Sequence, residues 1–148
     1  VNTMLNTHSG LYGVSGVSSD MREVLEARAR GRRRADVAFR MFCYRVKKYI
    51  GAYAAAMGGV DAVFMTGGIG ENSPDVREHS LSGLEFMGLE LDLGRNAELK
   101  GREGEISTEG SRVKAWVVPT NEEKTIARDV ARVLGGVMPT FEPPEVLS

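Results

Sequence analysis

The sequence predicts a single α/β domain in which helices flank a mixed β-sheet. Its 148 residues match the usual length of one domain, and 42% of them are hydrophobic, which is enough for a packed core. Two short apolar runs, at 60–66 and 113–118, read as strands, and each is followed by the start of a helix. A segment with helical periodicity, from about Arg33 to Met57, completes the α/β pattern.

The charges and the cysteine count exclude several classes of protein. Nineteen Lys and Arg against 20 Asp and Glu leave a net charge of -1, which argues against a general nucleic-acid binder or a cationic membrane-surface protein. The single cysteine excludes an intramolecular disulfide and favours a reducing compartment. No apolar run approaches the length of a membrane span, and no signal-peptide pattern is visible. We therefore expect a cytoplasmic chain with no nucleic-acid or membrane partner.

The basic residues are unevenly distributed along the chain. Ten of them lie between Arg22 and Lys48, where only three acidic residues occur. The run from Arg28 to Arg34, interrupted by Gly31, connects two predicted helices. A solvated turn is the favoured interpretation of this run, and a site for a polyanion is the alternative.

The first 30 residues predict a helix, a glycine-rich loop and a second helix. Residues 1–6 mix polar and apolar side chains as a helix does, and the absence of an initiator Met suggests a piece of a longer protein. Three glycines within residues 10–16 predict loop or turn backbone. Ser18 or Ser19 is the expected N-cap of the following helix, with Glu23 in its first turn.

The long helix predicted from Arg33 to Met57 has more than one apolar side. One line of apolar residues recurs at three- and four-residue steps, and Val37, Met41 and Tyr44 form a second line, so we expect cover on both sides. Cys43 is expected to be a small core residue of this helix. The glycine pair at 58–59 ends it.

The segment at 60–75 reads as strand, glycine loop and helix. Its apolar residues are continuous rather than alternating, which predicts a strand buried on both faces of a parallel or mixed sheet. Residues 67–72 are expected to form the turn, and Ser73, Pro74 and Asp75 open a helix with an N-cap, a proline and an acid.

The signals from residue 89 to the end are weaker. Residues 90–93 alternate, and 106–111 read as a hairpin arm before the strand at 113–118. Thr120 and Glu123 form a capping box for a helix at 121–134. The proline-rich tail from Pro139 is expected to be extended or disordered.

Three places could bind a ligand. The glycine loop lets backbone approach a phosphate, although a tight turn without a ligand explains it equally well, and it matches neither a Walker A loop nor a dinucleotide fingerprint. Asp20 and Arg22 could contact a ribose and a purine or phosphate, or form a surface ion pair. Glu122, at the end of a strand, could hold magnesium, or simply favour the start of a helix. His8 and His79 lack a paired acid or nucleophile and are expected at the surface or an interface.

Taken together, these segments resemble the acetate and propionate kinase family. The resemblance rests on residues 9–22, on 45–53, on Phe64 to Asn72 with its TGGIGEN loop, and on the PTNEE motif at 119–123, in the family's order. It covers about residues 1–136 and implies the actin-like ATPase, ribonuclease H-like fold. That range would be the family's C-terminal nucleotide-binding domain, followed by the tail at 137–148.

The resemblance also implies a function and a set of site residues. The activity would be transfer of phosphate from ATP to acetate, giving ADP and acetyl phosphate, with Mg²⁺ as cofactor and a homodimer as the assembly. Asp20, Met21 and Arg22 would border the adenine and ribose, and Glu122 would serve the magnesium site. The residues implied around the ribose and phosphates are Gly68, Ile69, Gly70, Glu71 and Asn72.

The sequence departs from the family pattern in one important way. It has no Asn-x-Gly-Ser-Ser-Ser-x-Lys phosphate loop and none of the family's catalytic residues, so we expect the chain alone to be inactive. Acetate and propionate both remain open as acceptor. A non-catalytic nucleotide-binding or dimerisation module is the alternative function, and a dinucleotide-binding oxidoreductase domain is a remote third.

Overall fold

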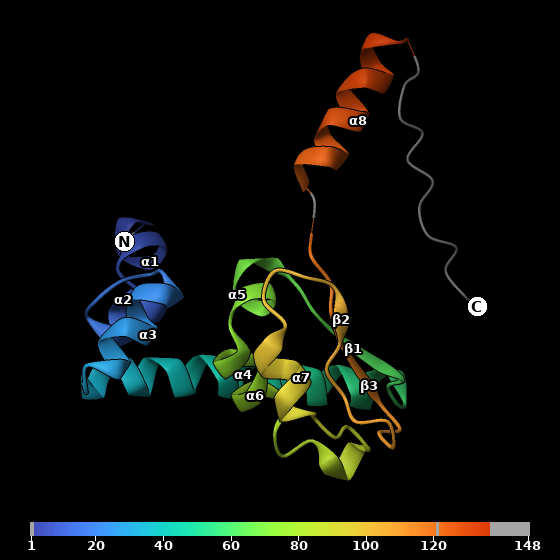
Figure 1. Ribbon diagram of the computed structural model, residues 1–148. Helices are drawn as coiled ribbons and strands as arrows, with labels where there is room; N and C mark the ends of the chain where they lie inside the picture. Colours follow the sequence, from blue (N-terminus) through green and yellow to red (C-terminus); the bar gives the residue numbers. More distant parts are fainter. Residues whose placement is uncertain (1, 121, 137–148) are drawn as a thin grey trace.

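The computed structural model describes residues 2–120 and 122–136. A three-stranded mixed sheet is flanked by helices, which confirms the predicted fold class (Figure 1). In chain order the elements are α1 (Asn2–Thr7), α2 (Gly10–Ser15), α3 (Met21–Ala29), α4 (Arg33–Met57), β1 (Ala62–Met65), α5 (Gly67–Asn72), α6 (Pro74–Leu81), η1 (Glu85–Met87), α7 (Leu93–Glu98), β2 (Gly104–Glu105), β3 (Lys114–Val117) and α8 (Glu122–Leu134).

The sheet has the strand order β1-β3-β2. Strands β1 and β3 are parallel, with Val63 opposite Ala115, and β2 runs antiparallel to β3, with Glu105 opposite Trp116. The hairpin arm predicted at 106–111 is therefore displaced, because β2 covers Gly104–Glu105, and Ser107 forms an isolated bridge to Leu91. The predicted strands at 60–66 and 113–118 are both present in shortened form.

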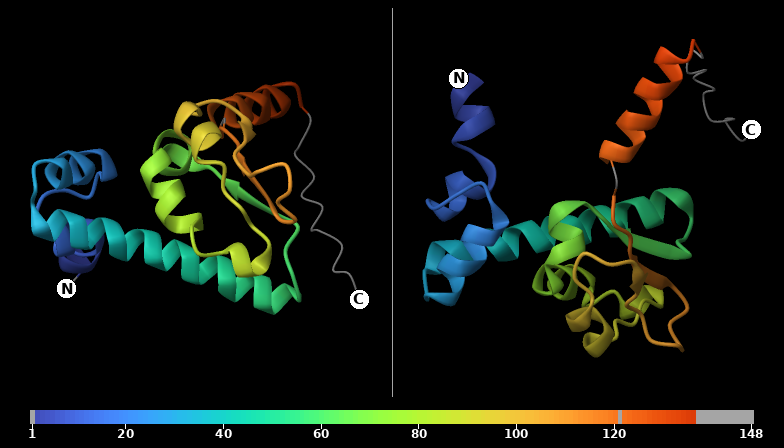
Figure 2. Two further views of the ribbon diagram at one scale, coloured as in Figure 1. Left: turned by 60° about the horizontal axis from the view of Figure 1, so that its bottom comes forward. Right: turned by 45° about the horizontal axis from the view of Figure 1, so that its top comes forward.

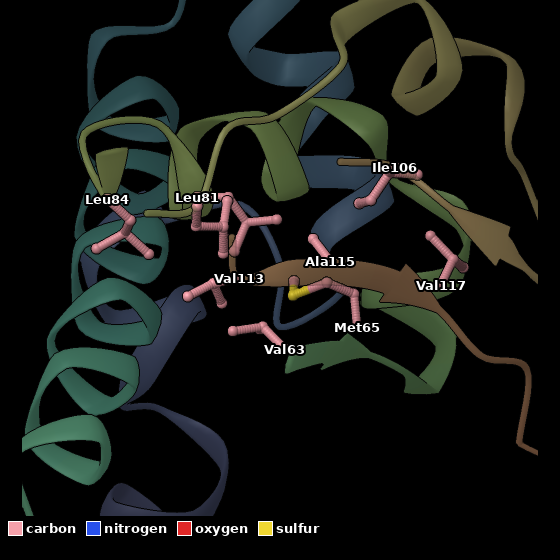
Figure 3. Packing of buried hydrophobic residues seen from close by; sticks show 9 residues of the cluster. Val63, Met65, Leu81, Leu84, Ile106, Val113, Ala115 and Val117 are labelled. Atoms are coloured by element: carbon pink, nitrogen blue, oxygen red, sulfur yellow. The ribbon is translucent and has the colours of Figure 1, made fainter. Parts of the chain in front are cut away.

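Strand β1 is buried on one face only, so the prediction of burial on both faces is wrong. Val63 and Met65 are buried, whereas Phe64 between them is 61% exposed. Alternate side chains of a strand point to opposite faces, and in the described residues only one face of this sheet is covered. That face meets residues of α6 and the loop after it, including Leu81 and Leu84 (Figure 3).

Helix α4 connects two hydrophobic cores. Its first half packs Phe39 and Cys43 against residues of α3 such as Val24, and its second half packs Ile50 against the core of the sheet. Figures 1 and 2 show α1–α3 at one end of α4 and the sheet at the other. Cys43 is buried, as predicted. The helix ends where predicted, at Gly58, which takes the left-handed conformation with φ 77°.

The second apolar line of α4 is exposed in the described part of the chain. Val37, Met41 and Tyr44 are 42%, 48% and 61% exposed, and Tyr49 and Tyr53 are exposed beside them. The expected cover on this side is therefore absent from the described part of the chain.

The glycine-rich stretch at 10–16 is a short helix, α2, and not the predicted loop. Gly10 and Gly16 have φ values of 61° and 65° and bracket the helix, while Gly13 lies inside it. A Cβ on Gly13 would lie only 2.8 Å from the carbonyl oxygen of His8, so a glycine is needed for this close packing of α2 on the preceding turn.

The C-terminal segment contains one predicted and one unpredicted helix. Helix α8 matches the helix predicted at 121–134, and α7 had no sequence signal beyond the short alternation at 90–93. Helix α8 extends away from the sheet (Figures 1 and 2) and leaves Ile126, Val130 and Leu134 exposed. The tail at 137–148 lies outside the described residues. Among the described residues, no helix is both long enough and apolar enough to span a bilayer.

Candidate functional site

A pocket of about 690 Å³ opens between the start of α3 and helix α5. Its volume lies within the range of about 300–1,000 Å³ that is usual for small-molecule sites. It brings together two segments that are far apart in the sequence. Six of the eight residues predicted to bind nucleotide line it, and Leu25 and Ser73 complete the lining. The six are Asp20, Met21, Arg22, Gly68, Ile69 and Asn72.

Local hydrogen bonds fix the position of Asp20 at the pocket. Its carboxylate accepts the backbone N–H of Arg22 at 2.8 Å, so Asp20 is the N-cap of α3. The predicted N-caps, Ser18 and Ser19, are therefore wrong. Ser18 lies two residues before Asp20, and its hydroxyl accepts the backbone N–H of Asp20 at 3.0 Å. Glu23 lies in the first turn of α3, as predicted.

Asp20 and Arg22 form an ion pair at the rim of the pocket. Arg22 Nη2 lies 2.6 Å from Asp20 Oδ2, and Arg22 Nε donates to both carboxylate oxygens at 3.1 Å. These side-chain bonds, with the backbone N–H of Arg22, lower the pKa of Asp20 to about 2. The Arg22 side chain is 88% exposed. Both groups are therefore charged and accessible to a ligand at neutral pH.

The inner wall of the pocket is apolar. Met21 is 3% exposed, and Leu25 and Ile69 are half-buried beside it. All three belong to the same hydrophobic cluster as Val24 and Phe39, in the core between α3 and α4. Packing against this core holds the wall in place, so the pocket offers a fixed apolar surface beside two charged groups.

The glycine loop is a short helix, α5, and not the predicted turn. Gly67 has a φ of 72°, which turns the chain out of β1, and Gly68 follows it at the pocket surface. Gly70 faces inward, because a Cβ on it would lie 3.1 Å from the carbonyl carbon of Met65. Gly70 therefore allows α5 to pack directly on the end of β1 and does not line the pocket.

Glu71 also faces away from the pocket. Its Oε1 accepts the backbone N–H and the hydroxyl of Thr120 at 2.8 and 2.9 Å. The backbone bond first, and the hydroxyl bond with it, hold the pKa of Glu71 below its usual range. Asn72 lies at the pocket, where its Nδ2 donates to the carbonyl oxygen of Gly68 at 3.0 Å. The loop thus provides Gly68, Ile69 and Asn72 to the pocket and uses Glu71 to bind the chain before α8.

Arg77 binds the C-terminal end of α5, a role that was not predicted from the sequence. This side chain is fully buried, and no carboxylate in the described residues pairs with it. Its guanidinium donates to the carbonyl oxygens of Gly70 and Glu71, to both oxygens of Asn96, and to the carbonyl oxygen of Leu99. A signal was present in the sequence, because helical spacing in α6 puts Arg77 on the same inward face as Ser80 and Leu81.

The predicted metal ligand cannot be assigned a position. The side chains of Glu122 and Glu123 lie outside the part of the chain that the structure describes, so the magnesium site and the capping box both stay predictions. Across the described side chains, no group of three or more His, Cys, Asp or Glu residues could hold a metal ion. His8 and His79 are exposed, as predicted, and the ring of His79 lies 4.8 Å from that of Phe39.

Comparison with known proteins places the chain in a family of kinases. The model of the Acetokinase family matches residues 1–128, and the chain belongs to this family. This match confirms the resemblance recognised in the sequence motifs.

Individual relatives agree with the family match. The chain is 56% identical to the acetate kinase of Halothermothrix orenii over 134 residues, which are 90% of this chain and 33% of that protein. The crystal structure of Porphyromonas gingivalis acetate kinase superimposes with a TM-score of 0.84 at 49% identity, covering 90% of this chain and 33% of that one. A propionate kinase from Francisella tularensis gives a TM-score of 0.76 at 37% identity, covering 86% of this chain and 32% of that one. The chain spans about a third of the length of the relatives that it matches.

Proposed function

We propose that this chain supplies the adenine-nucleotide side of an acetate kinase, which transfers the terminal phosphate of ATP to acetate and releases ADP and acetyl phosphate. The observation that carries the proposal is the pocket between α3 and α5, where six residues named from two separate motifs line one concave surface. Membership of the Acetokinase family supports it.

The lining of the pocket suits an adenine nucleotide. The apolar wall of Met21, Leu25 and Ile69 would pack against the base, since nucleotide bases bury their flat faces on apolar side chains. Asp20 would accept a hydrogen bond from a ribose hydroxyl or from the exocyclic amine. Arg22 would contact the base or a phosphate, and the exposed backbone at Gly68 would let the ligand approach α5 closely.

Magnesium is the cofactor that the family resemblance implies, and Glu122 is its proposed ligand. A glutamate carboxylate offers the oxygen ligands that suit Mg²⁺. When bound, the ion would neutralise charge on the phosphates.

Phosphoryl transfer needs groups on both sides of the transferred phosphate. This sequence contains no Asn-x-Gly-Ser-Ser-Ser-x-Lys loop, and the contacts proposed for the pocket between α3 and α5 are to the base, the ribose and the first phosphates only. We therefore expect the 148-residue chain alone to form no acetyl phosphate above a blank, and detection of the product would overturn this part of the proposal.

Acetate is the proposed acceptor, in preference to propionate. Acetate is the acceptor in the names of the curated relatives that are 51% to 56% identical to this chain. The test is a comparison of the two acceptors in a full-length enzyme that carries this chain. A higher kcat/KM for propionate would contradict the assignment.

A homodimer is proposed from the exposed apolar side of α4. Met41, Tyr44, Tyr49 and Tyr53 are each between 48% and 61% exposed, and burying such a surface against a second copy would be favourable. Light scattering should give a dimer mass for the chain and a monomer mass for the variant Tyr44→Glu/Tyr53→Glu. A monomeric parent chain would refute the assembly.

Nucleotide binding is tested by calorimetry with ADP and magnesium. Arg22→Gln and Asn72→Ala remove groups at the pocket and should each weaken binding at least several-fold. Arg102→Gln is the control, because it removes an equal charge from an exposed residue that does not line this pocket. No ADP binding by the parent chain, or equal weakening by the control, would contradict the proposal.

A further inference from the structure

A second concave surface, separate from the proposed nucleotide pocket, lies between α3 and the start of α4. Its volume is about 500 Å³. Four arginines and two aspartates contribute to its lining, which gives it a net positive charge. The charged residues are Arg28, Arg32, Arg33, Arg40, Asp36 and Asp75. We name it the arginine pocket.

Two of the four arginines share one aspartate as their partner. Arg28 Nε lies 3.0 Å from one carboxylate oxygen of Asp36, and Arg40 Nε lies 2.8 Å from the other. The Arg28 guanidinium also stacks 4.1 Å from the centre of the Phe39 ring, which fixes it in place. A single aspartate therefore orders two guanidinium groups at the base of the pocket and compensates one of their charges.

The other two arginines have no partner in the described residues. Neither Arg32 nor Arg33 makes a side-chain hydrogen bond or ion pair there, and both are exposed at the pocket. Their neighbours in the same run behave differently. Arg30 pairs with Glu26 at 3.0 Å, and Arg34 donates to the carbonyl oxygens of Gly13 and Val14, so neither lines the pocket. In the run from 28 to 34, three arginines therefore make contacts within the chain, and the other two, Arg32 and Arg33, face the pocket without a partner among the described residues.

Unpaired like charges in a concave surface repel each other, and an anion that bridges them would remove this repulsion. Guanidinium groups match phosphate oxygens in geometry, since the planar fork can donate two parallel hydrogen bonds to one phosphate. Helix α4 begins at Arg33, and the partial positive charge of its first turn adds to the potential that the arginines create.

We propose that the arginine pocket binds a compact polyanion that carries two or more phosphate groups. A small ligand fits better than nucleic acid or an anionic membrane, because the positive charge is confined to a hollow while the net charge of the whole chain is -1. Leu25 lines both this pocket and the proposed nucleotide pocket, so helix α3 is a wall shared by the two sites. The inference goes beyond the proposed function and does not depend on it.

Calorimetry with inorganic pyrophosphate, without nucleotide or magnesium, tests the proposal. Arg32→Gln/Arg33→Gln removes the two unpaired cations, neither of which supports the fold through a side-chain bond, and should weaken pyrophosphate binding about tenfold or more. Arg30→Gln/Arg102→Gln is the matched control, because it removes the same charge from exposed arginines outside the pocket and should leave binding within about twofold of the parent.

Three other results would each overturn the inference. These results are no binding of pyrophosphate by the parent chain at millimolar concentration, equal weakening by the two double variants, and tighter binding of a short oligonucleotide or of vesicles with anionic lipid. Arg22→Gln distinguishes the two pockets, since weakening of pyrophosphate binding by this variant alone would place the anion in the nucleotide pocket. ADP affinity, measured separately, should be unchanged in Arg32→Gln/Arg33→Gln.

Discussion

Replacing Arg77 should destabilise the protein more than replacing any exposed arginine. In Arg77→Met the side chain keeps most of its length but loses every donor. Four oxygen acceptors at the ends of α5 and α7 lose the bonds that Arg77 makes, three of them in buried bonds, while the carbonyl oxygen of Glu71 keeps the backbone N–H of Gly101 as a donor. A buried unsatisfied group costs about 1 kcal/mol or more, so the four acceptors together cost about 4 kcal/mol. Local relaxation towards water returns part of this cost, and we expect a net loss of about 2–4 kcal/mol.

Two further variants make the Arg77 test specific. Arg77→Lys keeps a positive charge but has three donors at one point in place of a planar fork, so it should recover only part of the stability. Arg30→Met is the control, since its ion pair with Glu26 is at the surface with side chains 71% and 69% exposed, and it should cost less than about 1 kcal/mol.

Urea unfolding, followed by circular dichroism, measures these differences, and calorimetry shows whether ADP binding is lost first. Because Arg77 holds the C-terminal end of α5, any Arg77 variant that still folds should also bind ADP more weakly. An Arg77→Met chain within about 1 kcal/mol of the parent would refute the reasoning, since the buried acceptors would then have found other partners at little cost.

Three further predictions concern other parts of the site and the core. The pKa of Asp20 is lowered from 3.8 to about 2, so the stability that its ionised form gives α3 should be complete above about pH 4 and be lost as the pH falls towards 2. NMR of the Asp20 carboxyl group should show this titration. Arg22→Gln should shift the pKa only part of the way back, because the backbone N–H of residue 22 still donates to the carboxylate. Gly70→Ala should lower the free energy of unfolding in urea by about 1–3 kcal/mol, because its Cβ would lie 3.1 Å from the backbone of Met65. Gly68→Ala, whose Cβ would meet nothing within 4 Å, should unfold like the parent. Equal stabilities of the two variants would contradict this account of α5. Burial raises the pKa of the Cys43 thiol, so the native chain should react with a thiol reagent far more slowly than the chain unfolded in urea, and equal rates would show that the residue is accessible.

Local patterns predicted the regular elements well. The periodicity from Arg33 and the glycine pair after Met57 gave both ends of α4, because a helix this long repeats its pattern many times. Short elements were less predictable. Gly67 to Asn72 has the composition of a turn, and it forms a helix because Gly70 packs on the end of β1, a contact that no local pattern reveals.

Tertiary contacts account for the remaining errors. Phe64 made the first apolar run continuous and suggested burial on both faces, but the described sheet covers one face only. Arg77 has no local partner, and its acceptors lie up to 22 residues away in the sequence. The predicted nucleotide residues were chosen by motif, and the motif could not distinguish Gly70 and Glu71, which support α5, from Gly68 and Ile69, which line the pocket.

Photolabelling with an azido derivative of ADP tests the central claim most directly, because it reports where the nucleotide binds and not only whether it binds. The account predicts labelled peptides from the start of α3, around Met21, and from α5, around Ile69, with labelling suppressed by excess ADP. Labelling that ADP suppresses at the arginine pocket, or at residues outside both α3 and α5, would contradict the account.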